Sequence, residues 1–188
     1  STPVSQIASI KVEDASNASV YDTSNSTFNL TPEFDIIQPD DSNDVLIAEE
    51  EYAIQWASTG ASLGEVNLEY CTDGGTIWNN VSTLRNVTNN GEYTWTSVNG
   101  TALTNTSLVR VSDPNRAESN ATSGAAFPIR GKLTLTAPVN ANENWRNGTT
   151  HDITWDYQGS MTNVNIYYSS DGGTGWTKLN PNPIACSN

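Results

Sequence analysis

The chain repeats itself, and this repeat limits the folds that it can adopt. Residues 53–60, Ala-Ile-Gln-Trp-Ala-Ser-Thr-Gly, align with residues 152–159, Asp-Ile-Thr-Trp-Asp-Tyr-Gln-Gly, at an offset of 99 positions. One residue is then lost, and residues 66–78 align with residues 164–176 at an offset of 98, with Asp-Gly-Gly-Thr in both copies. Self-similarity at a fixed offset predicts copies of one structural unit.

The same offset extends into the N-terminal region. Residues 10–14, Ile-Lys-Val-Glu-Asp, align with residues 109–113, Val-Arg-Val-Ser-Asp, again 99 positions apart. Phe28 and Leu30 likewise align with Phe127 and Ile129. We therefore expect a chain that starts and ends within a unit. Its three predicted parts are the terminal strands of one unit as a candidate donor segment (1–33), a complete unit (34–130) and an incomplete unit (131–188).

Apolar and polar residues alternate within the complete unit, as they do in half-buried strands. The alternation is clear at Ile54 and Trp56, and again at Val66 and Leu68. Residues 73–75, Asp-Gly-Gly, predict a hairpin turn because glycine adopts positive φ at little steric cost. About seven short strands in roughly 98 residues, without helical periodicity, predict an all-β fold of tandem immunoglobulin-like β-sandwiches.

The order of these residues resembles that of the Ig-like repeats of secreted surface proteins. That group includes the domain of fungal cell-wall Kre9/Knh1-like proteins and many prokaryotic cell-surface repeats. The resemblance implies a sandwich fold, export and a cell-surface or matrix role, without naming a ligand. The second copy also has the typical Trp145-x-x-Gly148, where the first copy has Leu46 and Glu49. The matching positions are Pro39, Ile54, Trp56, Gly60, Val66, Leu68, Tyr70, Asp73, Gly74, Gly75, Trp78, Gly91, Tyr93, Trp95, Val109, Arg110, Val111 and Asp113.

The charge argues against some classes of partner, and the sequons described below predict an extracellular or cell-surface location. The formal net charge is −13, with only eight Lys plus Arg, which argues against nucleic acid and anionic membranes as partners. No apolar run approaches the roughly 20 residues of a membrane span. Residues 1–4, Ser-Thr-Pro-Val, do not resemble an export signal, so we expect a mature chain or a fragment.

Asn-X-Ser/Thr sequons are enriched in the chain. On exported proteins such sites receive N-linked glycans, although Asn, Ser and Thr also gather in turns for structural reasons. We expect several of the nine sequons to be glycosylated. They are Asn17, Asn25, Asn29, Asn80, Asn86, Asn99, Asn105, Asn120 and Asn147.

Few residues suit catalysis. The single histidine, His151, aligns with the strand residue Tyr52 and is expected at a surface or a strand edge. Residues 169–176 resemble an Asp-box turn, which stabilises hairpins and carries no chemistry of its own. The sequence has no phosphate-binding loop, His/Cys metal cluster or nucleophile elbow. We therefore expect no enzymatic activity and no catalytic residue.

An acidic cluster follows Pro39. Asp40, Asp41 and Asp44 would supply hard oxygen ligands near a junction between units, where calcium stiffens tandem repeats. A solvated acidic loop explains the same residues, and no EF-hand spacing favours calcium. Apart from this calcium hypothesis, no cofactor is expected.

The two cysteines, Cys71 and Cys186, lie in different units. Export would place them in an oxidising compartment. A bond within the chain would have to join two sandwiches. An intermolecular disulfide and two unpaired thiols therefore both stay open.

A sandwich without its last strands would expose an unpaired edge and an open core. We expect strands of the 1–33 type from a neighbouring copy to complete residues 131–188, with main-chain hydrogen bonds supplying affinity. Head-to-tail repetition of this contact builds a filament. The candidate inserting side chains are Ile7, Ile10, Val12, Phe28 and Leu30.

Two alternatives stay open beside this filament. In one, the chain is a window from a longer tandem array, whose neighbouring repeats complete both ends. In the other, it is a carbohydrate-binding or adhesive module in which an exposed tryptophan stacks on sugar, and Trp145 is the best candidate. In both the filament and the array interpretations, the protein has a structural role.

Overall fold

The computed structural model describes residues 4–60, 63–81, 86–100, 103–140 and 143–186. Over these ranges the chain is all-β, in several sheets and without a helix. The predicted all-β class is thus confirmed, and the tandem immunoglobulin-like arrangement stays a prediction. None of the described residues belongs to a helix with the length and hydropathy that a membrane crossing requires.

Contacts divide the chain into two compact units. The first unit comprises Ser1–Asp44, Ala53–Trp95 and Asn105–Phe127, and the second comprises Val45–Tyr52, Thr96–Thr104 and Pro128–Asn188. The division differs from the repeat boundaries because two short segments of the 34–130 region group with residues 128–188. The domain boundaries inferred from the repeat stay a prediction.

The first unit holds most residues of twelve strands. They are β1 (Ser5–Ala8), β2 (Lys11–Asp14), β3 (Asn17–Thr23), β4 (Phe28–Leu30), β5 (Phe34–Gln38), β7 (Tyr52–Ser58), β8 (Glu65–Cys71), β9 (Asn79–Asn80), β10 (Asn86–Thr88), β11 (Glu92–Trp95), β12 (Thr104–Asp113) and β13 (Arg116–Thr122).

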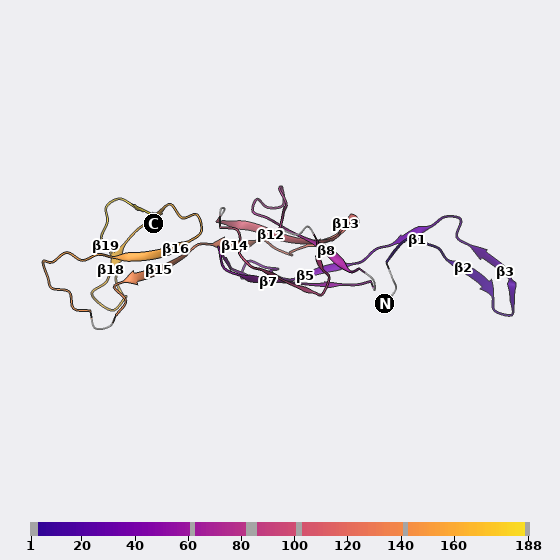
Figure 1. Ribbon diagram of the computed structural model, residues 1–188, viewed down its shortest axis with the longest axis horizontal. Coiled ribbons are helices and arrows are strands. Elements are labelled where there is room, and N and C mark those ends of the chain that lie inside the picture. Colours follow the sequence, from indigo (N-terminus) through magenta and orange to yellow (C-terminus); the bar gives the residue numbers. More distant parts are fainter. Residues whose placement is uncertain (1–3, 61–62, 82–85, 101–102, 141–142, 187–188) are drawn as a thin grey trace. The chain divides into compact units, whose positions relative to one another are not determined.

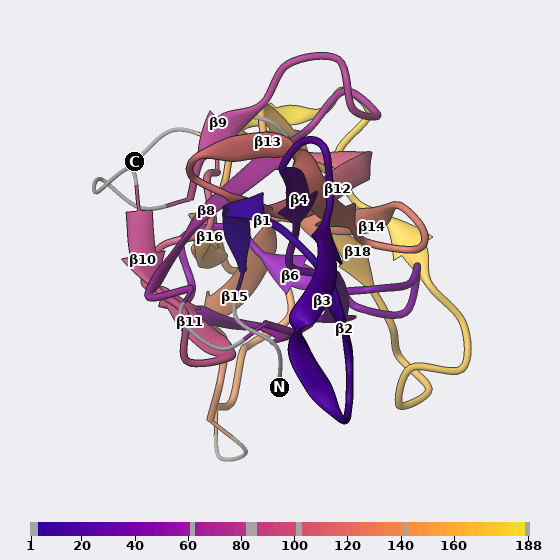
Figure 2. The same cartoon turned by 90° about the vertical axis from the view of Figure 1, so that its right-hand side faces the viewer.

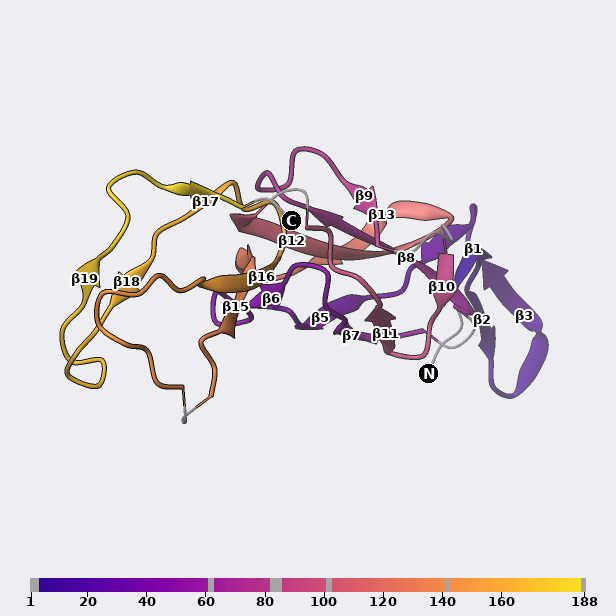
Figure 3. The ribbon, with the colours of Figure 1, turned by 60° about the vertical axis from the view of Figure 1, so that its left-hand side comes forward.

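The strands of this unit from β5 onward form two layers around one core, whereas β1 pairs with β4 and β2 with β3 in sheets of their own. Strands β10, β8 and β12 are consecutive neighbours in one sheet, and β11, β7 and β5 form the other. Figures 1 and 3 show β5 and β7 in one layer, with β8 and β12 in the layer facing it. The alternating apolar residues point between the layers, which is why Trp56 and Leu68 are almost fully buried.

One edge of strand β8 is covered by β12. The two strands run antiparallel, with Val111 opposite Leu68 and Val109 opposite Tyr70. Both valines are completely buried. Strand β12 therefore completes both the hydrogen-bonding of the sheet and the apolar core of this unit.

The N-terminal hairpin β2–β3 (Figure 2) has the same register as the hairpin β12–β13. Lys11, Val12, Glu13 and Asp14 pair with Thr23, Asp22, Tyr21 and Asn17, and every one of these pairs recurs 99 positions later. Main-chain bonds recur as well: the Ser24 amide donates to the Ile10 carbonyl, and the Ser123 amide donates to the Val109 carbonyl. The repeat seen in the sequence is therefore also a repeat of strand register.

The second unit holds most residues of the other eight described strands, six of which pair two by two in small sheets. They are β6 (Leu46–Ile47), β14 (Phe127–Arg130), β15 (Lys132–Ala137), β16 (Thr154–Gln158), β17 (Asn163–Val164), β18 (Tyr167–Tyr168), β19 (Thr177–Lys178) and β20 (Ile184–Ala185). Strand β14 pairs with β6 in parallel, whereas β15 pairs with β16, β17 with β20 and β18 with β19, all antiparallel.

Counterpart residues differ sharply in burial. Ile36 is 3% exposed in the first unit, whereas Leu135, 99 positions later, is 51% exposed. Val111 is fully buried, whereas its counterpart Val12 is 69% exposed. The same sequence pattern therefore closes a core at residues 34–130 and leaves apolar side chains in solvent on either side of it.

We predict that this contrast appears in stability. At low protein concentration, Ile36→Ala should lower the free energy of unfolding by about 2–5 kcal/mol, because the substitution leaves a cavity in a packed core. Leu135→Ala should cost about 1 kcal/mol or less, because half of that side chain is already exposed. Urea denaturation followed by tryptophan fluorescence measures both. Equal losses in the two variants would contradict the difference in packing.

Candidate functional site

A close contact at a glycine occurs twice in the chain, once in each unit. Gly60 has a φ of 99°, and a Cβ added to it would lie 2.8 Å from the Val4 side chain. Gly159, 99 positions later, has a φ of 84°, and its Cβ would lie 2.9 Å from the side chain of Leu103, the counterpart of Val4. Positive φ and lack of space both require glycine at these positions.

The backbone beside these glycines repeats too. The added Cβ of Gly60 would lie 3.7 Å from Pro32 Cα, and that of Gly159 would lie 3.4 Å from Gly131 Cα. Pro32 and Gly131 are again 99 positions apart. Each unit therefore contains the same joint between the end of one repeat and the start of the next. In the sequence, Gly60 and Gly159 are visible as glycines 99 positions apart. Only the structure shows which residues lie next to them.

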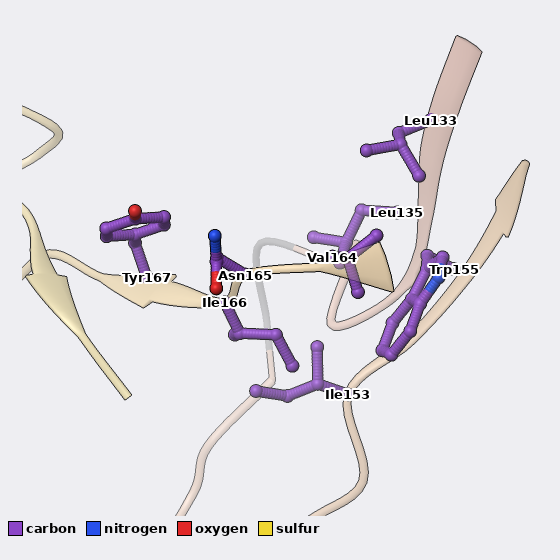
Figure 4. A pocket seen from close by; sticks show the side chains of 8 residues that line it. All are labelled: Leu133, Leu135, Ile153, Trp155, Val164, Asn165, Ile166 and Tyr167. Carbon is purple, nitrogen blue, oxygen red and sulfur yellow. The ribbon is translucent and has the colours of Figure 1, made fainter. Parts of the chain in front are cut away.

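Residues 131–186 contain an apolar groove. The groove is a cavity of about 280 Å³ that is open to solvent (Figure 4). Side chains from β15, β16 and β17 gather around it, among them Leu135, Trp155 and Val164. We call the six apolar residues below the acceptor groove; Asn165 and Tyr167 also line the cavity. They are Leu133, Leu135, Ile153, Trp155, Val164 and Ile166.

The acceptor groove corresponds residue by residue to the core of the first unit. Its members lie 98 or 99 positions after residues that are all buried. The sequence did not single out Leu133 and Leu135, because their counterparts carry different apolar side chains. The buried counterparts, in the same order, are Phe34, Ile36, Ile54, Trp56, Val66 and Leu68.

The strand segment 163–168, the counterpart of β8, is paired on one edge only within the described part of the chain. Val164 lies opposite Ile184 in β20, and Tyr168 lies opposite Thr177 in β19. In the first unit, the equivalent edge of β8 pairs with β10 and β9. No described strand pairs with the other edge, where β8 has β12. We call it the open edge.

The predicted inserting residues lie in or next to the N-terminal strands, and all but Leu30 are exposed. Ile10 is 58% exposed, whereas its counterpart Val109 is fully buried. Phe28 is also exposed and Leu30 is half-buried, whereas Phe127 and Ile129 lie in the core. Ile7 differs from this set, because its counterpart Thr106 is exposed too. The residues whose counterparts are all buried are therefore Ile10, Val12, Phe28 and Leu30.

The acidic loop binds its own backbone. The Asp44 carboxylate accepts the Asp40 amide at 2.7 Å, and the Asp41 carboxylate accepts the Asn43 amide at 2.6 Å. The Asp40 carboxylate accepts the Gly124 amide. Among the described residues, no group of three or more His, Cys, Asp or Glu side chains is arranged to hold a metal ion. Calcium binding here stays a prediction without support from the geometry.

The sequon asparagines are accessible to different degrees. Asn86 and Asn99 are half-buried, and the Asn86 side chain donates to Glu65. The other seven are exposed, which is compatible with attached glycans. They are Asn17, Asn25, Asn29, Asn80, Asn105, Asn120 and Asn147.

Both cysteines are free thiols in the structure. Cys71 is completely buried in β8, and Cys186 is half-buried. Burial keeps the Cys71 sulfur away from any second chain, so of the two only Cys186 is accessible in the folded protein. An intermolecular disulfide stays a prediction.

Trp145 lies in a loop of the second unit and is 45% exposed. Its ring stacks on that of His151, with centroids 4.4 Å apart and planes 1° from parallel. The imidazole is hydrogen-bonded to Thr149 Oγ1 at 2.7 Å. His151 is thus an exposed residue that stacks on a tryptophan. It belongs neither to the glycine joints nor to the acceptor groove.

The Asp-Gly-Gly turns are built from carboxylate–backbone bonds. Asp73 accepts the Thr76 amide at 2.9 Å, and Asp171 accepts the Thr174 amide at 3.1 Å. Bonds from the Ser169 hydroxyl, then from the Gly175 amide, lower the pKa of Asp171 below its ordinary value. Both aspartates therefore hold hairpin loops closed.

No family model matches the chain, and searches of curated proteins and of solved structures find no match either. The resemblance to Ig-like repeats of secreted surface proteins accordingly stays a prediction.

Proposed function

We propose that this chain is an extracellular structural protein whose sandwich units associate head to tail into a filament or surface array. Neighbouring units complete one another by donation of strands. The observation that carries the proposal is the match between two sets of apolar residues, those of the acceptor groove and those of the N-terminal segment. Among the described residues no strand covers the acceptor groove as β12 covers its counterpart, and the N-terminal segment carries exposed residues equivalent to those of β12.

The repeated joint supports a linear arrangement. Gly60 contacts Val4 in the same way that Gly159 contacts Leu103. A contact between the end of one repeat and the start of the next is heterologous, and its repetition extends a chain of units instead of closing a dimer. The neighbours are then further copies of this chain or adjoining repeats of a longer one.

Surface chemistry supports an extracellular setting. Seven sequon asparagines are exposed, and the net charge of −13 keeps single units hydrated and apart. Exposed apolar strands on a highly charged molecule suit specific strand pairing better than collapse. This role is structural, not catalytic.

We predict that the chain self-associates and that Ile10→Asp abolishes the association, because a carboxylate cannot enter an apolar groove without a partner. Ile77→Asp is the matched control: Ile77 is 63% exposed and lies outside the donor strands. Analytical ultracentrifugation over a range of concentrations measures the masses, and circular dichroism verifies folding. A wild-type chain that stays monomeric at every concentration would contradict the filament. An Ile10→Asp chain that associates normally would contradict the donor role.

A carbohydrate-binding role is the second candidate, and the exposed Trp145–His151 stack favours it. Aromatic faces held in place by a neighbour are suitable platforms for sugar rings. We predict that any glycan binding is lost in Trp145→Ala and retained in Trp176→Ala, which removes another exposed tryptophan. A glycan array measures both variants. Equal binding by the wild type and Trp145→Ala would exclude this site.

A further inference from the structure

We propose that the open edge of residues 163–168 binds residues 10–14 of a second copy, which are strand β2 and the residue before it. The pairing is antiparallel in one defined register, with Val12 opposite Ile166 and Ile10 opposite Tyr168. This inference rests on the proposed head-to-tail association and specifies its contact. It follows from the pairing of β12 with β8, in which Val111 lies opposite Leu68 and Val109 opposite Tyr70. Each residue of the proposed pairs is the counterpart of one of these.

The main-chain geometry fits an added strand. The Ile166 carbonyl accepts the Leu179 amide at 2.9 Å, as the Leu68 carbonyl accepts the Val81 amide at 3.0 Å. Both carbonyls therefore point to the occupied edge. Because successive residues of a strand direct their N–H and C=O groups to alternate sides, those of Asn165 and Tyr167 point to the open edge.

The donor side is prepared in the same way. Strand β2 already pairs with β3 through the register that joins β12 to β13. The proposed pairing uses the edge of β2 that faces away from β3. This edge corresponds to the edge of β12 that pairs with β8. The donor therefore arrives as a preformed hairpin, which reduces the ordering cost of binding.

A charged contact would accompany the pairing. Arg110 stacks on Trp78 with its guanidinium carbon 4.2 Å from the ring centroid. The counterparts of these two residues are Lys11 and Trp176, and Trp176 is 63% exposed. Glu69, which forms an ion pair with Arg110, is replaced by Tyr167. The joint between copies would thus hold the Lys11 ammonium among aromatic rings.

The register is tested by disulfide trapping between two preparations, one of them labelled with ¹⁵N so that mass spectrometry identifies mixed dimers. Both carry Cys186→Ser, and Cys71 stays buried. Val12→Cys mixed with Ile166→Cys should cross-link, because directly opposite residues place their Cα atoms about 4.5–5.5 Å apart. Ile10→Cys mixed with Ile166→Cys is the control, because a diagonal pair about 7–8 Å apart is out of reach.

Each outcome decides a different point. Preferential trapping of the Val12–Ile166 pair supports the register. Equal trapping of the control pair, or no trapping while the wild type still associates, overturns the register and leaves head-to-tail association standing. Absence of association in the wild type overturns the proposed function itself.

The aromatic contact has its own readout. Lys11→Gln should weaken association about 2- to 30-fold and reduce the accompanying change in tryptophan fluorescence, because it removes the cation from the ring. Lys11→Arg should preserve both, since Arg stands at the counterpart position. If Lys11→Gln associates like the wild type, with the same change in fluorescence, the Lys11–Trp176 contact is wrong.

Discussion

The pairing of β12 with β8 is the interaction on which the rest of the structure depends. It satisfies one edge of β8 and at the same time inserts Val109 and Val111 into the core. Where this strand is present, Phe34, Ile36, Ile54 and Trp56 are all buried. Where no described strand takes its place, at residues 163–168, the equivalent apolar side chains line a groove that is open to solvent.

A unit of this kind has two parts that can be separated in sequence. The strands from β5 to β8 provide the groove, and the β12–β13 hairpin with the residues around Phe127 provides its cover. The hairpin at residues 11–23 has the register of the β12–β13 hairpin, although Val12 is exposed where Val111 is buried. In the proposed filament such parts would be exchanged between neighbours, and the repeated glycine joint would give that exchange one direction. The acidic surfaces of two copies repel each other. Because salt screens this repulsion, added salt should favour assembly.

Much of this fold could be predicted from the sequence. The offset of 99 positions predicted equivalent strands, and the structure reproduces the pairing of residues 11–14 in residues 110–113. Period-two alternation predicted an inward face for Trp56 and Leu68, since the side-chain direction in a strand depends only on local geometry.

Other features could not be predicted, because they depend on contacts between distant residues. The sequence identified Ile7 as an inserting residue, and this stays a prediction; its counterpart at the offset of 99 is the exposed Thr106, in contrast to the buried counterparts of Ile10 and Val12. The acidic residues around Asp40 suggested calcium, whereas their carboxylates accept amide hydrogens of their own loop and of Gly124. Occupation of one edge of residues 163–168 by β19 and β20 left only the other edge for a partner, and no local pattern encoded that choice.

Hydrogen exchange at residues 165–167 is the most direct test of strand addition. The Ile166 amide already donates to Asn180 Oδ1 at 2.7 Å, so its exchange should change little when the chain assembles. The amides of Asn165 and Tyr167 point to the open edge and should become strongly protected as chain concentration rises. Growth of assemblies without any protection at these two amides would contradict strand addition.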